Sequence, residues 1–193
     1  MNGKRILITG ATNGIGLAAA RVLAVLGAKL AIVGRNEARA RNAAVRITAA
    51  SGQGATVDIF VADLSSQAVV RRLATEVLTR YPKLDVLVNN AGALYATRRL
   101  SEDGIELTWA VNHLAPFLLT RLLLDRLRES APARIVTTAS IIHMGAHKAF
   151  DSGAISAALP PRPPSWARRS DNLVGRLGEV SDEHRVDLDE LGP

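Results

Sequence analysis

Residues 4–27 read KRILITGATNGIGLAAARVLAVLG, and this stretch decides the fold. Its first part, KRILITG (4–10), is a short apolar run that predicts a buried strand. Its last part, GIGLAAARVLAVLG (14–27), has the pattern of a helix that we expect to end at Gly27. A strand that passes through a glycine-rich turn directly into a helix is typical of an α/β protein.

The same succession of strand and helix patterns continues along the chain. Further strands are predicted at 29–34, 55–64, 84–92 and 133–140, and further helices at 36–50, 65–81 and 101–130. The helix at 65–81 begins with a serine cap, and the pattern at 101–130 forms either one long helix or two joined near Pro116. Such alternation predicts a doubly wound parallel sheet of about five strands, with helices on both faces.

The composition changes after about residue 150. Five of the eight prolines in the chain follow that point, and the residues after the proline cluster are polar. Closely spaced prolines exclude a central strand and favour an extended linker. We therefore expect two parts: a folded domain over 1–150 and a proline-rich, mostly irregular or disordered tail over 151–193.

The composition also excludes several classes of function. The formal net charge is +6, but aromatic residues make up only 4% of the chain, so a nucleic-acid surface with aromatic stacking platforms is not expected. We favour a solvated basic surface that attracts small anions. The absence of cysteine excludes disulfides and thiolate metal sites and favours a cytoplasmic location. Charged residues interrupt the leucine-rich run 117–127, so no integral membrane segment is expected.

The glycines of the first turn predict a binding site for a phosphate group. Gly10, Gly14 and Gly16 let the backbone turn sharply and approach a pyrophosphate, whose charge rests on the helix N-terminal amides. No Lys-Ser/Thr pair follows, so a nucleotide-triphosphatase loop is not expected. At the end of the second strand, Arg35 favours NADP over NAD, because arginine accommodates a 2′-phosphate whereas a carboxylate binds a ribose 2′-hydroxyl. The alternative is that Arg35 merely begins a solvated helix.

Six motifs in order resemble the short-chain dehydrogenase/reductase family, especially its retinol-dehydrogenase-like and light-dependent-protochlorophyllide-reductase-like branch. They are TGATNGIG, GRN, ADL (62–64), LDVLVNNAG, DGIELTWAVNHLAPFLLTRLLL and ARIVTTAS, within roughly residues 4–150. The resemblance implies a Rossmann-like NAD(P)-binding domain. It also implies reversible hydride transfer between NADP and a small alcohol or carbonyl substrate.

The resemblance also implies which residues contact the cofactor. The diphosphate loop would comprise Thr9, Gly10, Asn13, Gly14, Ile15 and Gly16. Arg35 would contact the adenosine phosphate, and Asp63 and Leu64 would flank the adenine. The nicotinamide ribose side would be lined by Asn90, Ala91 and Gly92.

The catalytic set of the family is incomplete in this sequence. Ser140 and Asn112 match the family serine and asparagine, but no Tyr-x-x-x-Lys motif is present and no tyrosine follows Ser140. Tyr95 has Arg99 rather than lysine four residues later, so we do not expect it to replace the missing acid. His143 and His147 are spaced to share a helix face, but no acidic third ligand accompanies them. We interpret both as surface or loop histidines and expect no metal site.

These observations lead to a specific expectation about function. The chain is an oxidoreductase by descent whose C-terminal region is truncated, frame-shifted or divergent, which leaves the sheet incomplete on its C-terminal side. Hydride transfer is then impaired or lost. The alternatives are a non-catalytic dinucleotide-binding or interaction module, and a degraded fragment with no independent function. An exposed sheet edge or the long helix would favour a homo-oligomer.

Overall fold

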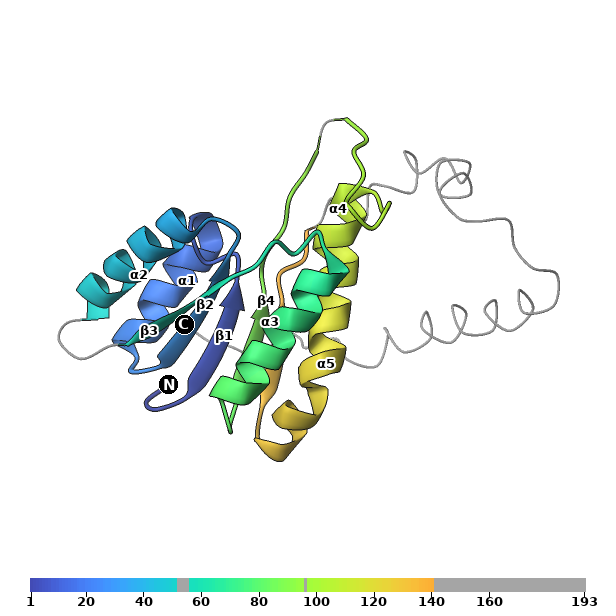
Figure 1. The fold of residues 1–193 in the computed structure, drawn as a ribbon. Coiled ribbons are helices and arrows are strands. Elements are labelled where there is room, and N and C mark those ends of the chain that lie inside the picture. Colours follow the sequence, from blue (N-terminus) through green and yellow to red (C-terminus); the bar gives the residue numbers. More distant parts are fainter. Residues whose placement is uncertain (52–55, 96, 141–193) are drawn as a thin grey trace, which may run out of the picture. The chain divides into compact units, whose positions relative to one another are not determined.

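The computed structural model describes residues 1–51, 56–95 and 97–140, which belong to one compact unit, Met1–Ser140 (Figure 1). Its strands are β1 (Arg5–Thr9), β2 (Lys29–Gly34), β3 (Val57–Val61), β4 (Val86–Asn89) and β5 (Arg134–Thr137). Its helices are α1 (Gly14–Val25), α2 (Glu37–Ser51), α3 (Gln67–Arg80), α4 (Leu107–Trp109), the π-helical turn η1 (Ala110–Leu114) and α5 (Ala115–Glu129). The expected tail over 151–193, and its boundary at residue 150, lie outside the described residues and stay predictions.

All five strands are parallel and lie in the order β3-β2-β1-β4-β5. The chain therefore builds the sheet outward from β1 to β3, then returns to the other side of β1 to place β4 and β5. This reversal creates a crevice between the carboxyl ends of β1 and β4, which is where open α/β sheets bind ligands. The predicted doubly wound parallel sheet is confirmed.

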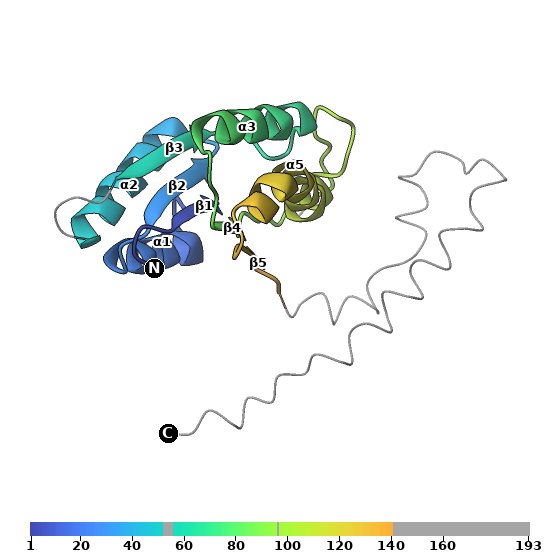
Figure 2. The same ribbon diagram turned by 90° about the horizontal axis from the view of Figure 1, so that it is seen from below.

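Helices cover both faces of the sheet (Figures 1 and 2). On one face, α3 and α5 pack over a core cluster that includes Leu7, Leu87 and Leu119. On the other face, α1 and α2 pack over a second cluster that includes Ile8 and Ile32. The strands contribute apolar side chains to both clusters, which explains why their sequences are continuously apolar rather than alternating.

The structure corrects the predicted start of the long helix. Helix α4 begins at Leu107 rather than at residue 101, because residues 101–106 form a loop in which Gly104 has a φ of 74°. The Glu106 carboxylate then caps the helix, since it accepts the N–H groups of Thr108 and Trp109 at 3.0 and 2.8 Å. Burial would raise the pKa of Glu106, but these two donors, the Thr108 side chain and the charge of Arg98 together hold the pKa below its usual value. The helix is continuous through Pro116, and its hydrogen-bond pattern changes just before this residue.

The helical run Leu107–Glu129 is long and apolar enough, by length and composition, to cross a membrane, contrary to the expectation from 117–127 alone. Core helices of soluble proteins satisfy the same criterion. The buried residues of α5 are spaced four apart and face the core cluster shared with α3; they are Ala115, Leu119, Leu123 and Leu127. We therefore interpret α5 as a core helix of the α/β unit.

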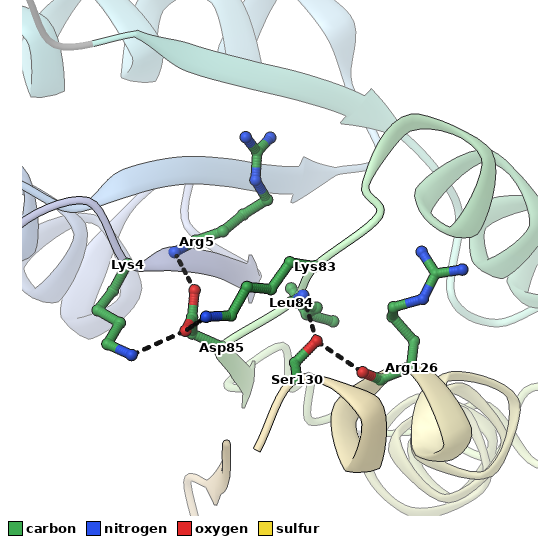
Figure 3. Close-up of polar contacts among 7 residues, drawn as sticks. All are labelled: Lys4, Arg5, Lys83, Leu84, Asp85, Arg126 and Ser130. Atoms are coloured by element: carbon green, nitrogen blue, oxygen red, sulfur yellow. Dashed lines mark hydrogen bonds and ion pairs between the residues drawn. The ribbon is translucent and has the colours of Figure 1, made fainter. Parts of the chain in front are cut away.

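A buried carboxylate holds the amino ends of β1 and β4 together, at the opposite end of the strands from the crevice (Figure 3). Asp85 is 3% exposed and accepts hydrogen bonds from the Lys4 ammonium and the Arg5 backbone N–H, both at 2.9 Å. Lys83 lies 3.4 Å from the same carboxylate. Burial alone would raise the pKa of Asp85, but the Arg5 N–H, the hydrogen bond and charge of Lys4 and the charge of Lys83 together outweigh it, so the pKa lies below its usual value. Nearby, the Ser130 hydroxyl accepts the Leu84 N–H at 2.9 Å.

Candidate functional site

A cleft of about 530 Å³ lies at the carboxyl ends of the strands. Six segments line it: the turn after β1, the end of β2 with the start of α2, the residues after β3, the loop after β4, Val111 of η1, and Thr138 just after β5. Among the predicted cofactor residues it is lined by Gly10, Asn13, Gly14, Ile15, Gly16, Arg35, Asp63, Leu64, Asn90, Ala91 and Gly92. The fold thus brings together on one cleft residues that are up to about eighty positions apart in the sequence.

Two glycines permit the close approach of the turns after β1 and β4. A Cβ atom on Gly10, whose φ is 68°, would lie 2.7 Å from the Ala91 Cα atom. A Cβ atom on Gly16 would lie 2.4 Å from the Asn90 Nδ2 atom and 2.5 Å from the Gly10 carbonyl oxygen. Real Cβ atoms do not tolerate such distances, so both positions require glycine for the two turns to meet.

The N-terminus of α1 is suited to an anion. Asn13 occupies the cap position, but its side chain makes no capping hydrogen bond, and the first turn carries no acidic residue. The first backbone N–H groups of a helix have no partner within the helix, and together with the helix dipole they attract negative charge. The end of α1 is therefore free to receive the phosphate groups of a ligand.

Thr9 is buried beneath the turn and does not line the cleft. It is 3% exposed, and its hydroxyl accepts the backbone N–H groups of Asn90 and Ala91, each at 3.0 Å. The Asn90 side chain returns two hydrogen bonds, from Nδ2 to the carbonyl oxygens of Thr9 and Gly10 at 3.0 and 3.2 Å. These bonds fasten β1 to the loop after β4 and fix the shape of the crevice.

Arg35 shares its side of the cleft with a second arginine that the sequence analysis missed. Arg39, in the first turn of α2, also lines the cleft, and its backbone N–H donates to the Asn36 side chain at 2.9 Å. The acidic residue between the two arginines is engaged elsewhere: Glu37 accepts a hydrogen bond from Arg41 Nε at 3.1 Å. Within the described residues neither cleft arginine has an acidic partner. Arg35 lies before the first residue of α2, so helix periodicity gave no signal that would have paired it with Arg39.

Asp63 and Leu64 lie on the cleft where the adenine was expected. The Asp63 carboxylate accepts the Ser65 backbone N–H at 2.9 Å and the Ser65 hydroxyl at 2.8 Å. These contacts hold the carboxylate in the turn between β3 and α3. Its predicted role beside the adenine stays a prediction.

Asn112 joins the helix to the loop after β4. Its side chain accepts the Ala93 N–H and donates to the Ala93 carbonyl oxygen, both at 2.8 Å. This two-point contact fixes the π-helical turn η1 against the loop after β4. Val111, the residue before Asn112, lines the cleft. Ser140 is exposed and lies three residues beyond β5, while Thr138 of the same segment lines the cleft. The catalytic roles assigned to Asn112 and Ser140 stay predictions.

The two tyrosines differ sharply in position. Tyr81 is 1% exposed, and its hydroxyl donates to Asp58 at 2.5 Å near the amino end of β3. Burial first, and then the contact with Asp58, raise the pKa of Tyr81 above its usual value. Tyr95 instead lines the cleft, with the Arg99 guanidinium 5.9 Å from its ring centre.

His143 and His147 lie outside the described residues. In the part of the chain that the structure describes, no group of three histidine, aspartate or glutamate side chains is placed to hold a metal ion.

Comparisons with known proteins agree with this geometry. The family model for short chain dehydrogenase matches residues 4–152. Retinol dehydrogenase 14 of Mus musculus is 43% identical over 152 residues, which cover 74% of this chain and 46% of that protein. The chain thus spans about half the length of the curated relatives it matches.

Solved structures with bound dinucleotides share the fold. The Pseudomonas aeruginosa RhlG/NADP active-site complex is 34% identical, with a TM-score of 0.63 over 73% of this chain and 56% of that one. An NADH-dependent reductase, A1-R′, complexed with NAD is 32% identical, with a TM-score of 0.61 over 72% of this chain and 61% of that one. Retinol dehydrogenases are among the relatives that the chain resembles, and the family model establishes that the chain belongs to the short-chain dehydrogenase/reductase family.

Proposed function

We propose that this chain binds NADP(H) in the cleft at the carboxyl ends of its strands. The observation that carries the proposal is the pair Arg35 and Arg39, two guanidinium groups on the cleft without an acidic partner among the described residues. Such a pair suits the 2′-phosphate that distinguishes NADP from NAD. The uncapped N-terminus of α1 would hold the pyrophosphate. Related structures are described with NADP and with NAD, so the preference for NADP rests on the two arginines.

The chemistry we propose for the family site is reversible hydride transfer with a small alcohol or carbonyl compound. The bound nicotinamide supplies or accepts the hydride. The residues of this chain bind the dinucleotide, and the contact of Asn112 with Ala93 fixes the loop beside it. Retinol dehydrogenase 14 is named for an alcohol substrate, which supports the substrate class without specifying the compound.

We propose further that the chain catalyses this hydride transfer slowly or not at all. The alkoxide formed by hydride addition to a carbonyl needs a proton donor whose pKa is adjusted by a neighbouring charge. The only two tyrosines are Tyr81 and Tyr95, and neither is followed by lysine at the fourth position. Tyr81 is buried near the amino end of β3, and Tyr95 is followed four residues later by Arg99 instead of the family's lysine. This observation favours the second candidate function, a dinucleotide-binding module without catalysis.

One experiment separates these functions. The full chain is titrated with NADPH and with NADH, and the same preparation is assayed for NADPH oxidation with a panel of small aldehydes and ketones. We expect tighter binding of NADPH and turnover far below common enzymatic rates of about 1–1,000 s⁻¹. Turnover in that range would refute the loss of catalysis. A folded chain that binds neither dinucleotide would refute both functions.

Association and location are also proposals. Strand β5 pairs only with β4 in the described sheet, and Ile135 and Val136 are 43% and 48% exposed, so we propose that copies associate through this edge. The long helix is the alternative surface, with Phe117 61% exposed. Sedimentation of Val136→Lys and Phe117→Lys would distinguish them, because only the variant at the true interface would shift toward monomer. We propose a cytoplasmic location from the absence of cysteine, and cell fractionation would test it.

A further inference from the structure

A second, much smaller cavity lies between the end of β4 and the helical run that carries Asn112. Its volume is about 10 Å³, and Asn89, Val111, Ala115, Pro116 and Leu119 are among the residues that line it. A volume of ~10–15 Å³ open to the centre of a water-sized sphere is what one buried water needs. The cavity is too small for any larger ligand.

The strand side of this cavity carries a buried acceptor. Asn89 is the last residue of β4 and is 5% exposed. Its Nδ2 atom donates to the Thr120 hydroxyl on α5 at 3.0 Å. Its Oδ1 atom is buried and has no hydrogen-bond partner among the groups that the structure describes. Buried polar atoms are nearly always hydrogen-bonded, so this oxygen indicates a ligand that donates a proton.

The helix side supplies a second acceptor. An α-helix would give the Val111 carbonyl the N–H of Ala115, but that N–H bonds to the Ala110 carbonyl oxygen in the π-helical turn. If the π-helical spacing continued by one residue, the Val111 carbonyl would accept from the N–H of residue 116. That residue is proline and has no N–H. The Val111 carbonyl thus lacks both of its usual helical donors, and Val111 itself lines the cavity.

We propose that the cavity binds one water molecule, which donates one hydrogen bond to Asn89 Oδ1 and the other to the Val111 carbonyl oxygen. A water has two protons to donate, and the residues that carry the two acceptors, Asn89 on β4 and Val111 on the helical run, both line the cavity. The water ties the carboxyl end of β4 to the turn that carries Asn112. The cavity adjoins the dinucleotide cleft, because Leu64, Ala91 and Val111 line both. The proposed water uses neither cleft arginine, so the proposal stands whether or not NADP(H) binds.

A crystal structure of the full chain, at a resolution that shows ordered water, tests the site directly. We expect one isolated peak of density within about 3.2 Å of both Asn89 Oδ1 and the Val111 carbonyl oxygen. A cavity without density would overturn the proposal. So would an Asn89 amide turned the other way, with Oδ1 accepting from the Thr120 hydroxyl.

Two variants test the site in solution. Asn89→Leu removes the acceptor, whereas Thr120→Val removes only the hydrogen bond between Asn89 and Thr120 and serves as the matched control. Magnetic relaxation dispersion of water ¹⁷O counts long-lived buried waters, and we expect Asn89→Leu to lose one while Thr120→Val keeps it. An unchanged count in folded Asn89→Leu would overturn the proposal. If Asn89→Leu does not fold, the crystallographic result decides.

Discussion

Replacing Arg39 by serine is expected to weaken the binding of NADPH and to leave the binding of NADH unchanged. Arg39 lines the cleft next to Arg35, and Glu37 is paired with Arg41 instead of neutralising either cleft arginine. Only NADPH carries the 2′-phosphate that these guanidinium groups would contact. The substitution therefore changes the discrimination between the two dinucleotides.

The expected magnitude follows from the exposure of the site. A hydrogen bond to a charged group contributes about 1.5–3 kcal/mol. Because Arg39 is exposed, solvent screens its charge, and we expect the lower end of that range. A change of about 1.4 kcal/mol corresponds to roughly tenfold in affinity. The Kd for NADPH should rise about tenfold at constant salt, and the difference should shrink as salt is added.

The assay is a calorimetric or fluorescence titration of the wild-type chain and of two variants. Arg46→Ser is the matched control, since it removes the same charge from the exposed face of α2, seven residues and roughly 10 Å farther along the helix. We expect it to bind both dinucleotides like the wild type. The reasoning fails if Arg39→Ser leaves the ratio of the NADPH and NADH dissociation constants unchanged. It also fails if both affinities fall equally, because Arg39 would then act through the fold.

Three other predictions concern the fold and its turns. Asp85→Asn should destabilise the unit by about 1–3 kcal/mol at pH 7, because Lys4 and Lys83 are partly exposed and screened. Because the pKa of Asp85 is depressed, its stabilisation is present above the unfolded pKa of about 3.9 and is lost as pH falls through the folded value. The free energy of unfolding, measured by denaturation between pH 7 and pH 3, should therefore fall more steeply for the wild type than for the variant. Gly16→Ala should abolish dinucleotide binding and lower stability by about 1–3 kcal/mol, since the new Cβ would overlap Asn90; unchanged binding in a titration would contradict this. Leu123→Ala, at a fully buried position of α5, should cost about 2–5 kcal/mol in urea denaturation, and a smaller loss would mean that α5 is not a core helix.

The sequence predicted the order of the elements because strong local patterns determine them. The strand at 29–34 is confirmed at both ends, as Lys29–Gly34, because apolar residues fill it and Gly27 ends the preceding helix pattern. The serine cap is also confirmed: the Ser66 hydroxyl accepts the Val69 N–H at 3.5 Å. Both features depend on residues close together in the chain.

The features that the sequence did not predict depend on contacts between distant residues or on fine backbone geometry. The start of the long helix at Leu107 follows from the backbone of the loop at Gly104 and from the Glu106 cap. The π-helical turn before Pro116 follows from how one helix accommodates a residue without an N–H. Arg39 lines the cleft because the tertiary fold places the start of α2 next to the turn after β1. Local periodicity alone does not encode such relations.

The stacked pair beside Asn112 gives the protein an optical reporter. The Trp109 and His113 rings lie 4.2 Å apart between centres and 19° from parallel, on the same turn that Asn112 fastens to the cleft loop. The chain has two tryptophans, so Trp166→Phe would leave all indole emission to Trp109. Reduced nicotinamide absorbs where indole emits, so cofactor arriving in the cleft would quench Trp109 by energy transfer. Occupancy of the cleft could then be followed in real time without any attached dye.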